Sequence, residues 1–252
     1  MQSSICAIIP ARYHSSRFEG KPLAKINGKP MIQHVVERAQ ASTLLNQVVV
    51  ATDDIRIAET VDAFGGTWVM TQKNHASGTD RLAEAAEKLD LDSEDVIVNI
   101  QGDQPLFAPE IVEEVARPLL EDATLSMSTL IYEIVLPEEI DNPNHVKVVF
   151  DNQWNALYFS RAAIPYCREK GVDLPVYYKH LGFYAYRKKF LSTFVSLPMG
   201  QWEHLEKLEQ LRALENGYTI RVVLTKNDSA EVDTPMDIIK VENLLRQQGQ
   251  LA

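Results

Sequence analysis

The N-terminal part of the sequence alternates short apolar runs, rich in β-branched residues, with amphipathic stretches. Apolar side chains within these stretches recur three or four positions apart, which is the spacing of one helix face. Strands that alternate with helices in this way form mostly parallel sheets covered by helices on both faces. The pattern therefore predicts an α/β fold, with strands at 5–9, 47–52, 67–71 and 95–100 and helices at 30–40, 54–64 and 78–89.

The rhythm changes after Asp122. Further runs predict strands with fewer helices between them, and hence a smaller, more antiparallel subdomain over about residues 123–200. No repeat, low-complexity segment or linker interrupts the chain, so we expect a single domain over residues 1–252. The predicted later elements are strands at 125–134, 145–150, 156–160, 180–186 and 219–225 and helices at 203–216 and 234–248.

The charge balance limits the classes of partner. The formal net charge is −10, the wrong sign for a broad nucleic-acid footprint, so an anionic substrate needs a local cationic pocket. Two isolated cysteines, Cys6 and Cys167, form neither a disulfide framework nor a zinc pattern, which favours a reducing compartment. No apolar stretch approaches the ~18 residues of a membrane span. We therefore expect a cytoplasmic protein that binds no nucleic acid and does not insert into a membrane.

A cationic loop follows the first predicted strand. Residues 10–22 carry Arg12, Arg17 and Lys21 beside Gly20. Arginine forks grip phosphate oxygens in pairs and lysine adds a point charge, so this loop is suited to a triphosphate, although a solvated charged loop has the same composition. The loop lacks the spacing of a P-loop and of the dinucleotide fingerprint, so neither an ATPase nor a dehydrogenase is supported.

Two aspartates are candidates for a magnesium site. Asp103 lies in the Gly102 turn directly after the apolar strand at 95–100, and Asp233 precedes Pro235. Magnesium usually takes one or two carboxylates together with phosphate oxygens and water. The alternatives remain open at this point, because Asp103 can stabilise its turn and Asp233 can cap the last helix.

Other polar groups give weaker signals. Residues 75–81 place polar groups at a helix start, where backbone N–H groups meet ligands or a side chain caps the helix. His180 and Tyr184 are separated by an even number of residues in a predicted strand, which puts both on one face.

Taken in order, the motifs of residues 5–237 resemble those of the 3-deoxy-manno-octulosonate (Kdo) cytidylyltransferases, the CMP-Kdo synthetases of lipopolysaccharide synthesis. A single such motif is weak, but the ordered set is specific. The motifs are Ala11-Arg12-Tyr13, Ser16-Arg17, Gly20-Lys21-Pro22-Leu23, Asn27-Gly28-Lys29-Pro30, Ala51-Thr52-Asp53, His75-x-Ser77-Gly78-Thr79-x-Arg81, Gln101-Gly102-Asp103, Asn142-Pro143-Asn144, Ser160-Arg161, His180-Leu181-Gly182, Leu208-Glu209-Gln210 and Val232-Asp233-Thr234-Pro235.

The resemblance implies a glycosyltransferase-A-like fold and a homodimer whose contact and sugar pocket use the 123–200 region. It also implies CTP and an eight-carbon sugar acid as partners, with attack of the sugar's anomeric hydroxyl on the α-phosphorus. The implied nucleotide-binding residues are Ala11, Arg12, Arg17, Lys21, His75, Ser77, Gly78 and Arg81. The implied sugar-binding residues are Gln101, Arg161, His180, Tyr184, Glu209 and Gln210. The implied Mg²⁺ ligands are Asp103 and Asp233, which are also implied as catalytic together with Arg17 and Lys21.

The sequence departs from the family pattern near both substrates. Phe18-Glu19 stands where the family loop usually has Leu-Pro, Gln104 where it usually has Glu, and residues 200–202 are also unlike the common version. These changes leave the sugar open between plain Kdo, the primary prediction, and a substituted one such as 8-amino-3,8-dideoxy-manno-octulosonate. A non-catalytic sugar-nucleotide sensor is a remote alternative. A measurement of CTP turnover to pyrophosphate would distinguish it from an enzyme.

Overall fold

A nine-stranded sheet organises the chain in the computed structural model, which describes residues 4–15, 18–169 and 176–247. Seven strands follow one another across the sheet in the order β11-β7-β10-β6-β1-β4-β5, and β8 and β9 extend it from β10. A separate two-stranded sheet pairs β2 with β3. The strands are β1 Ile5–Ala11, β2 Lys25–Ile26, β3 Lys29–Pro30, β4 Gln47–Thr52, β5 Thr67–Met70, β6 Val96–Asn99, β7 Met127–Glu133, β8 Lys147–Phe150, β9 Ala156–Ser160, β10 Tyr178–Arg187 and β11 Arg221–Thr225.

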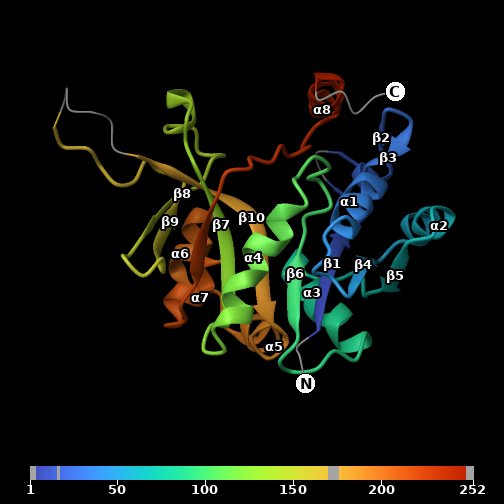
Figure 1. The fold of residues 1–252 in the computed structure, drawn as a ribbon, viewed down its shortest axis with the longest axis horizontal. Coiled ribbons are helices and arrows are strands. Elements are labelled where there is room, and N and C mark those ends of the chain that lie inside the picture. The colour runs from blue at the N-terminus through green and yellow to red at the C-terminus, as the bar shows by residue number, and fades with distance from the viewer. Residues whose placement is uncertain (1–3, 16–17, 170–175, 248–252) are drawn as a thin grey trace.

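Helices cover both faces of this sheet (Figure 1). The apolar sides of α1, α2 and α4 pack on one face, and those of α3, α5 and α7 pack on the other. This arrangement confirms the predicted α/β class. The helices are α1 Met31–Gln40, α2 Ile55–Ala63, α3 Gly78–Lys88, α4 Glu110–Glu121, α5 Lys188–Ser196, α6 Gln201–Glu206, α7 Leu211–Glu215 and α8 Pro235–Gln247, with short 3₁₀ turns at Lys21–Leu23 and Pro137–Glu139.

The two halves of the sheet differ in direction. Strands β6, β1, β4 and β5 are mutually parallel, as their continuous apolar runs predict. Strand β10 runs antiparallel to both β6 and β7, and the β8–β9 hairpin is also antiparallel. The antiparallel character expected after residue 122 is therefore present, with β7 and β10 inside the main sheet and β8 and β9 at its extension.

The single helix predicted over residues 203–216 is wrong. The chain forms α6 and α7 instead, and Lys207 between them has a left-handed backbone with φ of 55°. Leucines three apart drift around a helix by about 60° per step, so they cannot all face one core. Leu205 is accordingly 68% exposed while Leu211 is buried. The break leaves Glu209 in the connection between the two helices.

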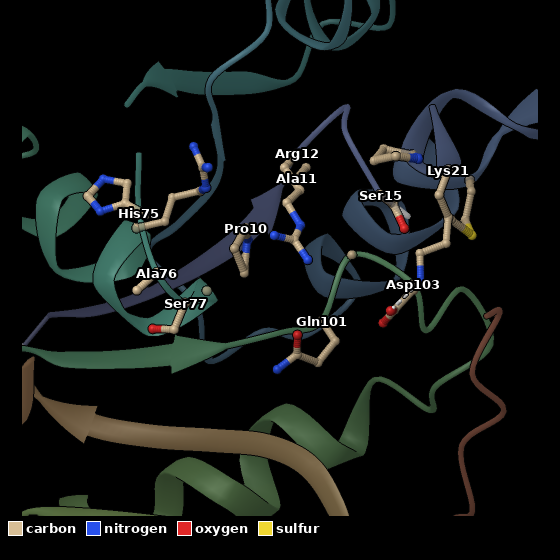
Figure 2. A pocket seen from close by; sticks show the side chains of 15 residues that line it. Pro10, Ala11, Arg12, Ser15, Lys21, His75, Ala76, Ser77, Gln101 and Asp103 are labelled. Carbon is tan, nitrogen blue, oxygen red and sulfur yellow. Dashed lines mark hydrogen bonds and ion pairs between the residues drawn. The ribbon is translucent and has the colours of Figure 1, made fainter. Parts of the chain in front are cut away.

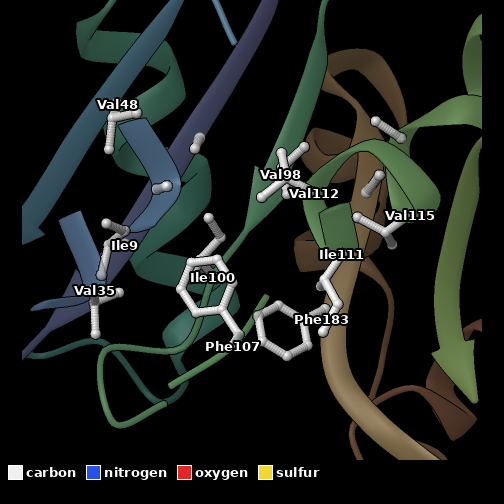
Figure 3. Close-up of a cluster of buried hydrophobic side chains, with 14 of the residues drawn as sticks. Ile9, Val35, Val48, Val98, Ile100, Phe107, Ile111, Val112, Val115 and Phe183 are labelled. Atoms are coloured by element: carbon white, nitrogen blue, oxygen red, sulfur yellow. The ribbon is translucent and has the colours of Figure 1, made fainter. Parts of the chain in front are cut away.

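Helices α4 and α5 were not predicted. Helix α4 contains Pro118, which argues against a helix, but the buried side of α4 packs across β7 and β10. The rings of Phe107, just before α4, and Phe183 on β10 lie 5.4 Å apart in the core (Figure 3). This contact fixes the segment after β6 against β10, and so it sets the relation between the two halves of the site described below.

Candidate active site

A cavity of about 260 Å³ lies where β1 and β6 end and α3 begins (Figure 2). The carboxyl ends of parallel strands are where open α/β sheets bind their ligands. Nine residues implied by the resemblance line this cavity, although they come from three separate segments. The lining residues are Pro10, Ala11, Arg12, Ser15, Lys21, Pro22, Met31, His75, Ala76, Ser77, Gly78, Arg81, Gln101, Gly102 and Asp103.

The cationic loop forms one wall of the cavity. Gly20 has a left-handed backbone with φ of 69°, and its N–H donates to the Tyr13 carbonyl at 2.9 Å, which folds the loop back before Lys21. Arg12 is exposed and projects between the 75–77 segment and the Lys21–Asp103 pair (Figure 2). The structure thus brings Arg12 and Lys21 to one cavity. Arg17 lies outside the described residues.

The opposite wall is the start of α3. Ser77 caps this helix by accepting a hydrogen bond from the Asp80 N–H, while Asp80 accepts one from Ser77. The capping alternative is therefore correct for Ser77, although the residue also lines the cavity. His75 contacts the Glu84 carboxylate, which also accepts the backbone N–H of Gln72 and so holds the 72–77 segment to the helix.

Arg81 is almost fully buried behind this wall. Its guanidinium donates to Asp53 Oδ2 at 2.8 Å and to Thr71 Oγ1. Asp53 and Glu84 are positioning residues: Asp53 belongs to a motif that carries the resemblance but was given no role, and Glu84 was not singled out. The sequence gives no local signal for Glu84, because its contact with His75 depends on how the 72–77 segment folds against α3.

The two aspartates meet around one ammonium. Lys21 Nζ lies 2.7 Å from Asp103 Oδ2 and 3.5 Å from Asp233 Oδ1, and it also donates to the Val232 carbonyl at 2.9 Å. The Val232 N–H donates to the Asp103 carbonyl, which ties the loop after β11 to the end of β6. At the start of α8 the Asp237 carboxylate accepts the N–H groups of Asp233 and Thr234.

This group of oxygens fits a hard divalent cation. Two carboxylates and one carbonyl converge on a position that already holds a positive charge. Within the described part of the chain, no three His, Cys, Asp or Glu side chains form a closed metal site. A magnesium site does not need one, because substrate phosphates and water complete its octahedron.

A polar cluster adjoins the cavity. We use this name for Asn99, Gln101, Gln104, His180, Tyr184, Glu209 and Gln210. Tyr184 pairs with Asn99 across β10 and β6, its ring lies 5.2 Å from that of His180, and Glu209 accepts from Thr79 at the start of α3. Gln101 donates to the Gly182 carbonyl, so the cluster reaches the cavity wall.

Several buried atoms of this cluster have no hydrogen-bond partner among the described residues. They belong to side chains on β6, after β6 and between α6 and α7. A buried polar atom without a partner costs about 1–3 kcal/mol, so these atoms are available to water or to a polar ligand. The atoms are Asn99 Oδ1, Gln104 Oε1, Glu209 Oε1 and Gln210 Nε2.

Burial controls protonation in the cluster. It lowers the pKa of His180 from 6.5 to about 3, and it raises the pKa values of Tyr184 and Glu209. The Thr129 hydroxyl donates its proton to the Phe183 carbonyl at 2.7 Å, so His180 Nε2 must be the donor in its 2.9 Å contact with Thr129. His180 is therefore neutral, and its Nδ1 is an acceptor.

Arg161 lies apart from the cavity lining. Its guanidinium donates to the carbonyls of Glu206 and Pro143, and its N–H donates to the Glu206 carboxylate. These contacts anchor the end of α6, from which the chain continues to Glu209. The structure therefore connects Arg161 to the polar cluster through the backbone.

Comparison with known proteins shows the family of the chain. The family model described as Cytidylyltransferase matches residues 6–222, and the chain belongs to that family. The 3-deoxy-manno-octulosonate cytidylyltransferase of Syntrophus aciditrophicus is 59% identical over 97% of this chain and 98% of its own length. The 8-amino-3,8-dideoxy-manno-octulosonate cytidylyltransferase of Shewanella loihica is 57% identical over 93% of this chain and 96% of its own length.

A solved structure extends the comparison to three dimensions. CMP:2-keto-3-deoxy-manno-octonic acid synthetase complexed with CTP matches with a TM-score of 0.92 and 43% identity, over 98% of this chain and all of that one. The resemblance found in the sequence is thus confirmed. No helix among the described residues is long and apolar enough to cross a membrane.

Proposed function

We propose that the protein transfers the cytidylyl group of CTP to the anomeric hydroxyl of Kdo, giving CMP-Kdo and pyrophosphate for lipopolysaccharide synthesis. The observation that carries the proposal is the contact between two unlike sites. One is a cavity with cations and hard oxygen ligands, and the other is a polar cluster with unpartnered buried atoms. An 8-amino-substituted Kdo is the second candidate acceptor, because relatives of both specificities are 57–59% identical to this chain.

CTP occupies the cavity in this proposal. Arg12 and Lys21 neutralise the triphosphate from one wall, and the start of α3 offers backbone N–H groups to the nucleotide from the other. Glu84 holds His75 in place, and Asp53 holds Arg81 in place. This wall is therefore preorganised before CTP binds. Arg17 is expected to join the cations of the first wall.

Asp103 and Asp233 hold Mg²⁺ in this proposal, with the Val232 carbonyl beside them. The bound ion supplies charge neutralisation at the α-phosphate and lowers the pKa of the attacking hydroxyl. Lys21 balances the two carboxylates in the ligand-free protein. When CTP arrives, the Lys21 ammonium exchanges these carboxylates for phosphate oxygens and stabilises the departing pyrophosphate.

The sugar acid binds along the polar cluster. Neutral His180 accepts a hydrogen bond from a sugar hydroxyl at Nδ1, and protonated Tyr184 donates one. Glu209 and Gln210 offer atoms that have no hydrogen-bond partner among the described residues. Gln101 belongs to both sites, since it lines the cavity and contacts β10. The cluster therefore orients the anomeric hydroxyl toward the α-phosphorus, and the reaction is accelerated mainly by positioning and charge.

We also propose a cytoplasmic homodimer, as the resemblance implies. The 123–200 region exposes Trp154, Leu157 and Met199, which are 41%, 59% and 62% accessible, and α6 exposes Trp202 and Leu205 nearby in the chain. Large exposed apolar side chains in one region are typical of subunit contacts. Sedimentation equilibrium gives the subunit number, and Leu157→Glu is expected to shift it toward the monomer.

Turnover tests the proposed function directly. The protein is incubated with CTP, magnesium and either sugar acid, and pyrophosphate release is measured. We expect release that needs CTP, the sugar and the divalent ion together. A protein that binds CTP and sugar but releases no pyrophosphate is a sensor, and the proposal is then wrong.

A further inference from the structure

The departure at Gln104 has a structural counterpart far away in the sequence. Gln104 is 1% exposed, and its Nε2 donates to Glu231 Oε1 at 2.9 Å. Glu231 is two residues before Asp233 in the loop that runs from β11 toward α8. The contact joins residues 127 positions apart, so the side chain at 104 controls where the Glu231 carboxylate lies.

The pair explains why an amide stands at position 104. A glutamate there would place a second carboxylate at hydrogen-bond distance from Glu231, beside Asp103 and Asp233, and two such charges repel strongly. With glutamine the local negative charge is retained but lies on the loop after β11 rather than at the end of β6. The pair therefore carries one negative charge, and that charge lies on Glu231.

Glu231 differs from the other acidic side chains at the site in its partners. Lys21 bridges Asp103 and Asp233, and Arg212 lies 3.7 Å from Glu209. The hydrogen-bond partner of the Glu231 carboxylate among the described residues is the neutral Gln104 amide. Burial and the charges of Asp103 and Asp233 raise the pKa of Glu231, and Lys21 offsets this only in part. Its residue is solvent-exposed, so a ligand can reach it.

The neighbourhood of Glu231 offers acceptors. Gln104 Oε1 is buried without a partner, and the Glu231 carboxylate accepts from Gln104 only at Oε1. Gln104 also lies against Gly182 of β10, since a Cβ on that glycine would be 3.8 Å from Gln104 Nε2. The pair thus stands between the carboxylates at Lys21 and the β10 side of the polar cluster.

We propose that Glu231, held by Gln104, is a specificity-determining residue of the sugar site that pairs with an ammonium group on the sugar acid. The inference rests on the proposed function and names the feature that separates its two acceptors. An ammonium has three donors, no acceptor and a positive charge, which matches a carboxylate held by a neutral amide beside a free acceptor. A hydroxyl in the same place donates one hydrogen bond and carries no charge, so Glu231 stabilises bound Kdo less than the amino sugar.

The test compares kcat/KM for 8-amino-3,8-dideoxy-manno-octulosonate and for Kdo, with CTP and magnesium in excess. Glu231→Gln keeps the shape of the side chain and removes its charge. We expect this variant to lower the ratio of amino to hydroxyl sugar about tenfold or more, since the loss falls on the charged substrate. Taking a ratio cancels any effect of the variant on CTP or on the cation site.

Asp228→Asn is the matched control. Asp228 is in the same loop, and Lys179 keeps its contact with Glu139 when Asp228 is neutralised. This variant makes the same change in net charge, and we expect it to leave the sugar ratio within about twofold. An equal shift in both variants means that the effect is a general field, and an unchanged ratio in Glu231→Gln means that Glu231 contacts no ammonium; either result overturns the inference.

Binding separates this inference from the proposed function. Calorimetry of each sugar with the protein and a non-transferable CTP analogue gives the same ratio without turnover. If the wild-type protein releases no pyrophosphate but its binding ratio falls in Glu231→Gln, the enzyme proposal fails and the recognition proposal holds. If turnover proceeds but Glu231→Gln changes neither the kinetic nor the binding ratio, the enzyme proposal holds and the recognition proposal fails.

Discussion

The nucleotide side and the sugar side of the site consist of different kinds of chemical group. Cations and backbone groups directly after β1 and at the start of α3 form the nucleotide side, and Arg12 there is exposed. The sugar side uses polar side chains on β10, on β6 and between α6 and α7, several of them buried without partners. A triphosphate is recognised by charge, whereas a sugar is recognised by where its hydroxyls lie.

This difference decides how each side responds to change. Charged groups open to solvent tolerate small displacements, because Coulomb attraction falls slowly with distance and water screens errors. Buried hydrogen bonds depend on distance and angle, and an unmatched partner costs free energy. We therefore expect losses of rate at the carboxylates that join the two sides, losses of sugar binding in the polar cluster, and small effects in the outer loop.

The largest effect is expected where the sides meet. Asp103→Asn and Asp233→Asn each remove one charge from the oxygens around Lys21, and we expect kcat to fall by about 10³-fold or more, roughly 4 kcal/mol of transition-state stabilisation. Melting temperatures and circular dichroism should change little, since both side chains remain partly exposed. A near-normal rate in either variant at ordinary magnesium concentration removes the two-carboxylate site.

A pH effect on stability is expected on the sugar side. The pKa of His180 is about 3 when folded and 6.5 when exposed, so the unfolded chain binds the extra proton between these values. Stability should therefore decrease as pH falls from about 6.5 toward 3, by roughly 4 kcal/mol from this residue. His180→Gln keeps a donor for Thr129 and should flatten that part of the curve.

Urea unfolding of the two proteins at several pH values measures this difference. Glu209 contributes in the opposite direction, because burial raises its pKa and protonation then favours the folded state. It is present in both proteins, so subtraction isolates His180. Parallel curves for the wild type and the variant would mean that folding does not lower the pKa of His180.

Much of the fold follows from local patterns. Apolar runs between helical stretches indicated β1, β4, β5 and β6. Strands β1, β4 and β6 are mostly buried and so are recognisable without their neighbours, whereas β5 lies at the sheet edge and is only partly buried. The break at Lys207 was not recognisable, because it depends on tertiary contacts. There the Glu203 carboxylate receives two hydrogen bonds from the Arg212 guanidinium in a buried pair, and the chain turns between them.

The site also has a part that the sequence predicted and a part that it did not. The cavity residues are contiguous in three motifs, so their grouping followed once the parallel sheet was assumed. The position of Lys21 between Asp103 and Asp233 brings together residues 82 and 212 positions apart, and no spacing predicts that. The Gln104–Glu231 contact is equally distant in sequence, although the unusual residue at 104 marked one end of it.

Removing one hydroxyl probes the sugar side more gently. Tyr184→Phe keeps the ring beside His180 and deletes a donor from the polar cluster. We expect the KM for the sugar acid to rise about tenfold while the KM for CTP stays within about twofold, the result of one lost hydrogen bond to substrate. Tyr186→Phe is the control, since the Tyr186 hydroxyl bonds to Thr79 within the protein. Equal changes in both KM values would show that the two sides are not separable.

The smallest effect is expected in the cationic loop, at Glu19. Its side chain is 65% exposed and lies 3.4 Å from His14, an exposed pair worth at most about 1 kcal/mol. Glu19→Pro removes a negative charge near Arg12 and Lys21 and reduces the freedom of the unfolded loop, so CTP affinity should be unchanged or up to about threefold higher. Glu19→Ala removes the charge alone, and the difference between the two variants measures the contribution of rigidity. Titration of CTP into each protein measures the affinity. A tenfold loss of affinity in Glu19→Pro with normal binding by Glu19→Ala would mean that the loop must flex to admit the triphosphate. The nucleotide side would then tolerate change less well than its exposed, charged groups indicate.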